Sequence, residues 1–254
     1  MKKVPYLNDY TLVDNIEFLS QCVLYVSVLI SIGTLIISKG NFLIHRDGVI
    51  HLVNSLNCIL AILYFFSDII TNYIFQDAES KRRDDFFDNS LNTKIAEENS
   101  QGYFSNDGHS PGIMKMGVNC FENSYLTKSV ATKMLRLMVI KSIVVLVLFI
   151  VMAFLPDRDF LITAVQLALP FTIIQQTVRL FIFRNRIARV FRHFQQIFSS
   201  TTNGQKEQLI IHNVTSYETT LAWACIKLDS KLFNKMNPDL SLQWEDKKKS
   251  YNLA

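Results

Sequence analysis

The sequence predicts an all-α membrane protein with four transmembrane helices in two hairpins and a cytosolic helical module. Three observations lead to this fold class. Hydrophobic residues make up 49% of the 254 residues, a share that soluble domains of this size rarely reach. Charged residues avoid four long blocks of the chain, each close to the ~20 residues with which a helix crosses ~30 Å of hydrocarbon. Lys and Arg gather on one side of the layout that these blocks imply.

The four apolar blocks are, in chain order, residues 18–38, 50–75, 137–155 and 160–183. The first carries no charge, and the third is nearly pure aliphatic after Lys141. The second is interrupted by polar residues, and the fourth contains Pro170 and several glutamines. A buried core helix of a soluble protein is the alternative for any one block. Four such blocks in one chain favour membrane spans, and Pro170 predicts a kink in the last of them.

Basic residues beside the blocks predict which segments face the cytoplasm. The connection between the first two blocks holds the basic residues Lys39 and Arg46, and that between the last two holds Arg158. By contrast, "KRR" follows the second block and "RNRIARVFR" follows the fourth. Because flanking Lys and Arg favour the cytoplasmic side, both termini and the middle segment are expected inside. The predicted organisation is an amino-terminal segment with the first hairpin, a cytosolic insert, a second hairpin and a cytosolic helical tail, at residues 1–75, 76–136, 137–183 and 184–254.

Six polar residues of the second and fourth blocks are the candidate functional side chains of the membrane region: Asn54, Asn57, Asp68, Gln166, Gln175 and Arg179. Those of the second block follow helical steps of three and four and share one stripe. Polar groups in hydrocarbon need a partner helix or water, so two interpretations compete. The residues either join helices by hydrogen bonds or line a water-filled path in an oligomer, since four spans are too few to enclose a wide pore.

The cytosolic insert combines a helical pattern with a loop. Phe87, Leu91 and Ile95 recur every four residues among charges, which predicts that the helix of the second block continues over residues 77–99. Residues 102–125 then combine glycines, turn signals and aromatic residues. Such a loop either packs on the tail as a structural element or holds a planar, negatively charged ligand by stacking and backbone amides. The candidate ligand-binding residues are Tyr103, Phe104, Lys115 and Asn119.

The tail is predicted to consist of several helices. Apolar residues within 187–198 form one face, typical of a helix that either lies on the anionic inner membrane surface or extends the fourth block. From Ile210 to Leu232 apolar positions repeat at steps of four and three, which predicts one packing helix for a core or a partner. Asn237 and Pro238 fit the cap and first residue of a last short helix.

No motif in a recognisable setting indicates catalysis, metal binding or duplex nucleic-acid binding. Four cysteines and five histidines are scattered without the spacing of a zinc site. HExxH does not occur, and the GxSxG match at Gly108–Gly112 lies in the predicted loop without the strand–turn–helix setting of a nucleophile elbow. No basic groove with interleaved aromatic residues suggests a duplex. We therefore expect no enzymatic activity, no metal, no cofactor and no duplex nucleic-acid partner.

Two stretches carry a resemblance to a known family: "GYFSNDGHSPGIMKMGVNCFENSYLTK" and "SYETTLAWACIKLDSKLFNKMNPDLSLQWEDKKKSYNL". With the four-span layout, the chain resembles the SMODS-associated four-transmembrane effectors, which are encoded beside bacterial cyclic-nucleotide synthases in CBASS-type antiphage systems. The resemblance implies a multi-pass protein of the bacterial inner membrane. It also implies a cyclic oligonucleotide, made by a neighbouring synthase after infection, as the signal for membrane damage and abortive death.

These observations lead to one expected function and two alternatives. We expect a signal-gated, homo-oligomeric effector that permeabilises the inner membrane in antiphage abortive infection, with the lipid bilayer and a nucleotide second messenger as partners. The first alternative is a non-conducting membrane anchor or adaptor that recruits a soluble partner through the helical tail. The second is a subunit of a small-solute transporter.

Overall fold

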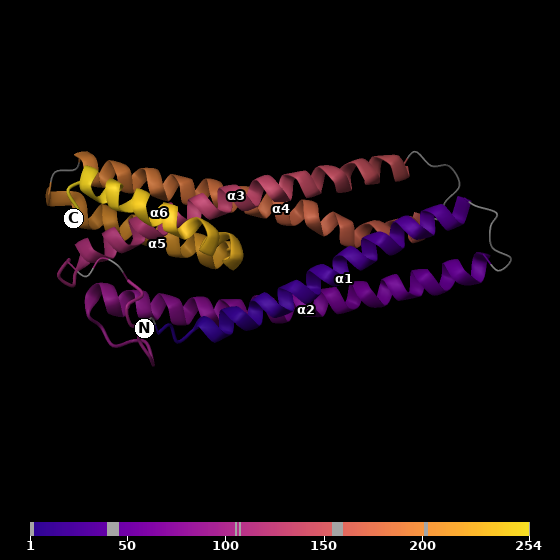
Figure 1. Cartoon of the computed structure of the whole chain (residues 1–254), viewed down its shortest axis with the longest axis horizontal. Coiled ribbons are helices and arrows are strands. Elements are labelled where there is room, and N and C mark those ends of the chain that lie inside the picture. Colours follow the sequence, from indigo (N-terminus) through magenta and orange to yellow (C-terminus); the bar gives the residue numbers. More distant parts are fainter. Residues whose placement is uncertain are drawn as a thin grey trace. The chain divides into compact units, whose positions relative to one another are not determined.

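Six α-helices contain most of the residues that the computed structural model describes, which are 3–39, 46–104, 106, 108–153, 160–200 and 203–253 (Figure 1). The helices are α1 (Leu7–Lys39), α2 (Arg46–Leu91), α3 (Ile113–Ala153), α4 (Phe160–Ser200), α5 (Asn203–Ala224) and α6 (Ser230–Ser250). Over this described part, the single extended pairing is an isolated antiparallel bridge between Lys3 and Gln101. The predicted all-α class is therefore confirmed.

The chain divides into two compact units. We call the first the module; it comprises Met1–Tyr10, Phe75–Arg136 and Arg179–Ala254. We call the second the bundle; it comprises Thr11–Ile74 and Leu137–Val178. The boundaries fall inside helices, so α1, α2, α3 and α4 each supply residues to both units.

The bundle is built from the apolar parts of four helices. Leu24, Tyr64, Val145 and Ile173, one residue from each of α1 to α4, form a buried cluster. Two helices, over Leu7–Ser31 and Gly48–Leu91, are long and apolar enough to cross a membrane. Only 11% of the most apolar stretch of α2 is buried, unlike the core helix of a soluble protein. The third and fourth expected spans fall partly on residues outside the described set, so four spans stay a prediction.

Helix α2 ends earlier than the sequence predicts. The helix was expected to reach residue 99, but it stops at Leu91, and Asn92 adopts a left-handed conformation with φ 58°. The cause is Asp88, whose carboxylate accepts hydrogen bonds from the backbone N–H groups of Ile95 (2.8 Å) and Ala96 (2.9 Å). Thr93 and Asn99 donate to the same carboxylate. The segment after Leu91 is thus folded around one side chain instead of continuing the helix.

The module has an aromatic core around Phe121 of α3. The ring of Phe121 lies 5.1 to 5.7 Å from five other rings, measured between centroids, and these belong to Phe191, Phe194, Phe198, Trp244 and Tyr251. Aromatic pairs at this spacing add to the hydrophobic stabilisation of the burial itself. The core therefore ties α3 to α4 and α6, elements far apart in the sequence.

The tail confirms one prediction and corrects two. Helix α4 is continuous to Ser200, so the segment after residue 183 extends the fourth block, one of the two alternatives left open. The expected single helix from Ile210 to Leu232 is wrong, because α5 ends at Ala224 and Cys225 is left-handed with φ 47°. The expected start at Asn237 and Pro238 is also wrong. Asp229 caps α6 by accepting from the Leu232 N–H (2.8 Å), and Pro238 lies inside that helix.

Candidate functional site

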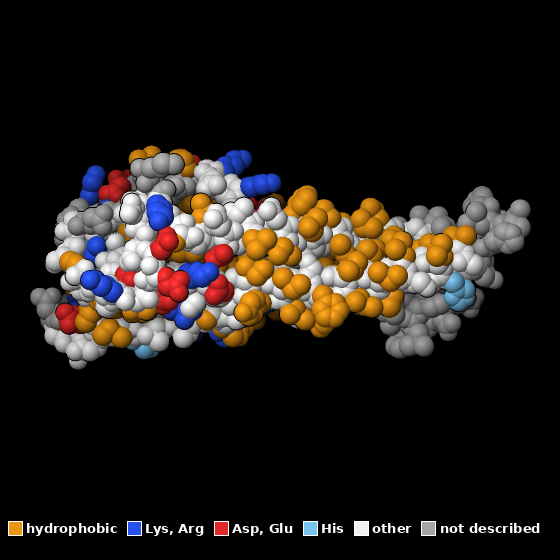
Figure 2. Space-filling model, turned by 90° about the horizontal axis from the view of Figure 1, so that it is seen from below, with side chains coloured by type: hydrophobic (Ala, Val, Ile, Leu, Met, Phe, Trp, Pro, Cys, Tyr) orange, Lys and Arg blue, Asp and Glu red, His pale blue; other side chains and the backbone are white. Residues whose placement is uncertain are grey.

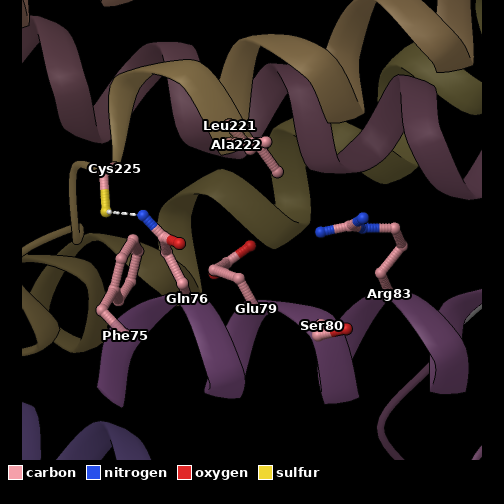
Figure 3. A pocket seen from close by; sticks show the side chains of 8 residues that line it. All are labelled: Phe75, Gln76, Glu79, Ser80, Arg83, Leu221, Ala222 and Cys225. Atoms are coloured by element: carbon pink, nitrogen blue, oxygen red, sulfur yellow. Dashed lines mark hydrogen bonds between the residues drawn. The ribbon is translucent and has the colours of Figure 1, made fainter. Parts of the chain in front are cut away.

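A pocket of about 230 Å³ lies in the module between α2 and α5 (Figure 3). Its lining residues are Phe75, Gln76, Glu79, Ser80 and Arg83 from α2, Leu221 and Ala222 from the end of α5, and Cys225 directly after it. Residues three and four apart on a helix share one face, so α2 presents a polar wall, while α5 supplies an apolar one. The amide of Gln76 points to Cys225, with its Nε2 atom 3.7 Å from the Sγ atom.

A network of largely buried charges includes Glu79 of this wall. Arg82 donates from Nε to Glu79 (2.8 Å) and from a terminal nitrogen to Glu218 of α5 (2.6 Å). Tyr10 donates its hydroxyl to the other oxygen of Glu79 at 2.5 Å. Burial by itself would lower the pKa of Arg82, but the carboxylates of Glu79 and Glu218 raise it well above the usual value. The guanidinium therefore stays charged and joins α2 to α5.

Arg83 differs from its neighbour in how its donors are used. Its guanidinium points across the polar wall of the pocket (Figure 3), and its Nε atom is 3.7 Å from the Glu218 oxygen that Arg82 already binds. No hydrogen bond partner for this Nε is found among the described residues. A half-exposed guanidinium with donors to spare beside an apolar wall can hold a small ligand with one acidic group. No group of three or more potential metal ligands occurs in the part of the chain that the structure describes.

The four predicted ligand-binding residues have different environments. Tyr103 is 43% exposed, and its ring meets Phe104 edge-on at 5.1 Å and Tyr6 at 6.4 Å. Lys115 is buried. Asn119 is also buried, and its amide is used within the protein: it accepts from Asn106 (3.0 Å) and donates to Asn89 and Ser90. Asn119 thus stabilises the packing of the insert and has little capacity left for a ligand.

The candidate polar residues of the second block differ in burial. Asn57 is buried and bridges two serines of α1: it accepts from the Ser27 hydroxyl and donates to Ser31 (3.2 Å). Asn54 is half-buried, whereas Asp68 is exposed and accepts a hydrogen bond from Asn72 at 3.0 Å. Asn57 therefore joins helices within one chain, while Asp68 faces outward.

The candidates of the fourth block are divided in the same way. Gln175 is exposed on the bundle, Arg179 is half-buried in the module, and the side chain of Gln166 lies outside the described residues. Sequence reasoning missed two interhelical contacts here: Gln176 donates to the Tyr64 hydroxyl (2.8 Å), and the hydroxyls of Ser142 and Thr177 are 2.6 Å apart. Their signal was the presence of hydrogen-bonding residues inside apolar blocks.

Sequence reasoning also missed the charge network, because it used the "KRR" stretch only to orient the spans. Glu79 and Arg82 are three residues apart on one helix, and this spacing was a signal for the ion pair between them. No local pattern indicated Glu218 as the second partner. Comparison with known proteins adds no assignment: no family model, no curated protein and no solved structure matches this chain.

Proposed function

We propose that the chain is an oligomeric, signal-gated effector that crosses the inner membrane four times and permeabilises it. The resemblance to the SMODS-associated four-transmembrane group supports antiphage abortive infection as the setting, with a nucleotide second messenger as the signal. The module would receive the signal, and the bundle would lie in lipid with both termini on the cytoplasmic side. No catalytic step is part of the proposal.

The observation that carries the proposal is the exposed apolar surface of the bundle. Figure 2 shows apolar side chains covering the part of this surface that the view presents, whereas charged side chains gather over the module. Residues at least half exposed come from all four helices and include Phe18, Leu19, Leu29, Leu52, Phe65, Tyr73, Ile140, Ile143, Phe171 and Val178. A continuous apolar surface of this kind is typical of a membrane or protein contact and would promote aggregation in water.

Two exposed polar residues within this surface support assembly. Asp68 is exposed among Phe65, Phe66 and Ile69, and Gln175 is exposed four residues after Phe171. A carboxylate or amide facing hydrocarbon is costly unless a neighbour or water satisfies it. Asp68 has one such neighbour in Asn72 (3.0 Å). Contact with a second copy would provide further partners, and a ring of copies would line a conduit with these groups.

Dye-loaded vesicles test the proposal. The full chain is reconstituted at increasing protein-to-lipid ratios, with and without cyclic di- and trinucleotides, and release of carboxyfluorescein is followed. We expect leakage that rises more steeply than protein density, because several copies must assemble. Asp68→Leu and Gln175→Leu should reduce it at least severalfold, whereas the matched control Ile70→Leu should not. Absence of leakage under every condition, or equal leakage from all variants, would contradict the proposal.

The adaptor alternative required that the apolar face of the Ile210 helix be free to bind a soluble partner. Ile210, Val214 and Tyr217 of α5 are buried against other parts of the module, so this face is already occupied by the chain itself. Exposed residues of α5 such as Trp223 remain. Capture of one defined partner by the full chain, without any leakage, is the outcome that would favour this alternative.

A further inference from the structure

Four cations of the module lie close together at α3, α4 and α6. We call them the basic cluster: Lys128, Arg184, Arg192 and Lys247. The ammonium of Lys128 is 3.8 Å from the ring centroid of Phe191 and 5.9 Å from that of Tyr125. The ammonium of Lys247 is 5.3 Å from the Tyr125 centroid, so two cations share one aromatic ring. Cation–π contacts hold both ammonium groups in place without neutralising them.

No carboxylate balances this cluster in the part of the chain that the structure describes. Arg184 donates to Thr132 (3.1 Å) and Asn185 (2.9 Å), both of which are neutral. Two other cations of the module are paired with carboxylates: Arg82 with two glutamates, and Lys248 with Glu245 at 2.8 Å. The basic cluster thus differs from these paired cations, because its positive charges lie together without a neutralising carboxylate among the described residues.

Repulsion between the cations of the cluster affects the protonation of Lys128. The pKa of Lys128 is lowered, first by burial and then by the charges of Lys247, Arg184 and Arg192. Each cation destabilises its neighbours, and an anion placed among them would remove this penalty. The cluster is accessible, because Arg192 is exposed and the other three side chains are half-buried.

We propose that the basic cluster is a binding site for an anion whose phosphate carries two or more negative charges. Lysine ammonium groups bind phosphate as point charges, and guanidinium groups bind it through two parallel hydrogen bonds, so both kinds of donor present here suit a phosphate. Two sources share this chemistry. One is a soluble polyphosphate, and the other is the headgroup of an anionic lipid, since Arg184 directly follows the fourth apolar block. The site does not depend on whether the chain permeabilises membranes.

Tryptophan fluorescence of the full chain in detergent micelles provides the test. The chain has two tryptophans; in a Trp223→Phe background the remaining one, Trp244, lies 6.4 Å from the Tyr125 ring and reports on the cluster. The probes are sodium tripolyphosphate, dihexanoyl phosphatidic acid and, as the uncharged-headgroup control, dihexanoyl phosphatidylcholine. The test variant is Arg192→Gln with Lys247→Gln. The matched control is Arg189→Gln with Lys249→Gln. It also removes one arginine from α4 and one lysine from α6, but both lie outside the cluster.

We expect saturable binding of a phosphate probe that weakens with added salt. Affinity should fall ~tenfold or more in the cluster variant, because two charged donors to the phosphate are lost, and by less than about twofold in the control. Binding of tripolyphosphate assigns the site to a soluble anion, and binding of phosphatidic acid alone assigns it to a lipid headgroup. If neither probe binds saturably, or if the two double variants lose affinity equally, the proposed site is wrong.

Discussion

Substitution of Gly117 by alanine should destabilise the module, although alanine is the better helix former. A Cβ atom at position 117 of α3 would lie 2.9 to 3.1 Å from three side-chain carbons of Ile210, which is fully buried on α5. Replacing a helical glycine by alanine stabilises by ~1 kcal/mol, whereas overpacking a core costs ~1–3 kcal/mol. The expected net loss is therefore up to ~2 kcal/mol. The close approach of α3 and α5, not helix propensity, decides whether the substitution lowers or raises the free energy of unfolding.

The reasoning can be tested in a double-mutant cycle. Ile210→Ala alone should cost ~2–5 kcal/mol through the cavity it leaves. In that background Gly117→Ala meets no branched side chain, so it should become stabilising by ~1 kcal/mol, a reversal of sign. Guanidinium unfolding of the full chain in micelles measures the effect by fluorescence, because both Trp223 and Trp244 belong to the module.

Gly204→Ala is the control for this cycle. Its Cβ would have no atom within 4 Å, so no loss of stability is expected. If Gly117→Ala has the same effect in both backgrounds, Ile210 is not the obstacle and the packing argument fails.

Three further predictions concern the charges of the module. Arg82→Met should lower stability by ~3–5 kcal/mol, since it leaves Glu79 and Glu218 buried without their cation, and Glu218→Gln in the same chain should restore part of the loss in guanidinium unfolding. Burial lowers the pKa of Lys227 to about 8; the unfolded chain then binds more protons between pH 8 and 10, so stability should rise with pH over that window, and Lys227→Met should flatten the rise. For Asp88, burial alone would raise the pKa, but hydrogen bonds from the following loop lower it below the usual value. The folded state then gains stability above pH 4 that is lost as the pH falls through this lowered pKa, and Asp88→Asn should show lower stability at pH 7 and a flatter acid limb in thermal unfolding.

Apolar length and periodicity were sufficient to predict the helices but not their ends. As far as the chain is described, the four apolar blocks fall in α1, α2, α3 and α4, one block in each helix. The pattern predicts a helix in either case, because burial in a core and contact with lipid both favour apolar side chains. The end of α2 depends on a carboxylate that collects donors up to eleven residues away. The break after Ala224 depends on the left-handed conformation of Cys225, which the residue type alone does not predict. Helix ends are thus set by side-chain partners that periodicity does not contain.

The candidate sites show the same limit. Sequence spacing correctly placed polar residues at helical steps, but it could not say which side of the stripe faces a neighbouring helix. Asn57 found partners on α1, 30 and 26 residues away in sequence, and the pocket required α5 to meet α2 through Arg82 and Glu218, 136 residues apart. Contacts of this range follow from packing of the whole unit, because many pairings satisfy the same local pattern.

The inward polar groups of the bundle restrict where water could cross it. Within one chain, the amide of Asn57 is satisfied by two serines, and the hydroxyl of Tyr64 accepts from Gln176. Tyr64 also belongs to the buried cluster that contains Leu24 and Val145. These inward groups are therefore already used for contacts between helices of one chain, as far as the bundle is described. A conduit, if one forms, must use the outward residues of several copies, so substitutions of inward residues should alter stability, and those of outward residues should alter leakage.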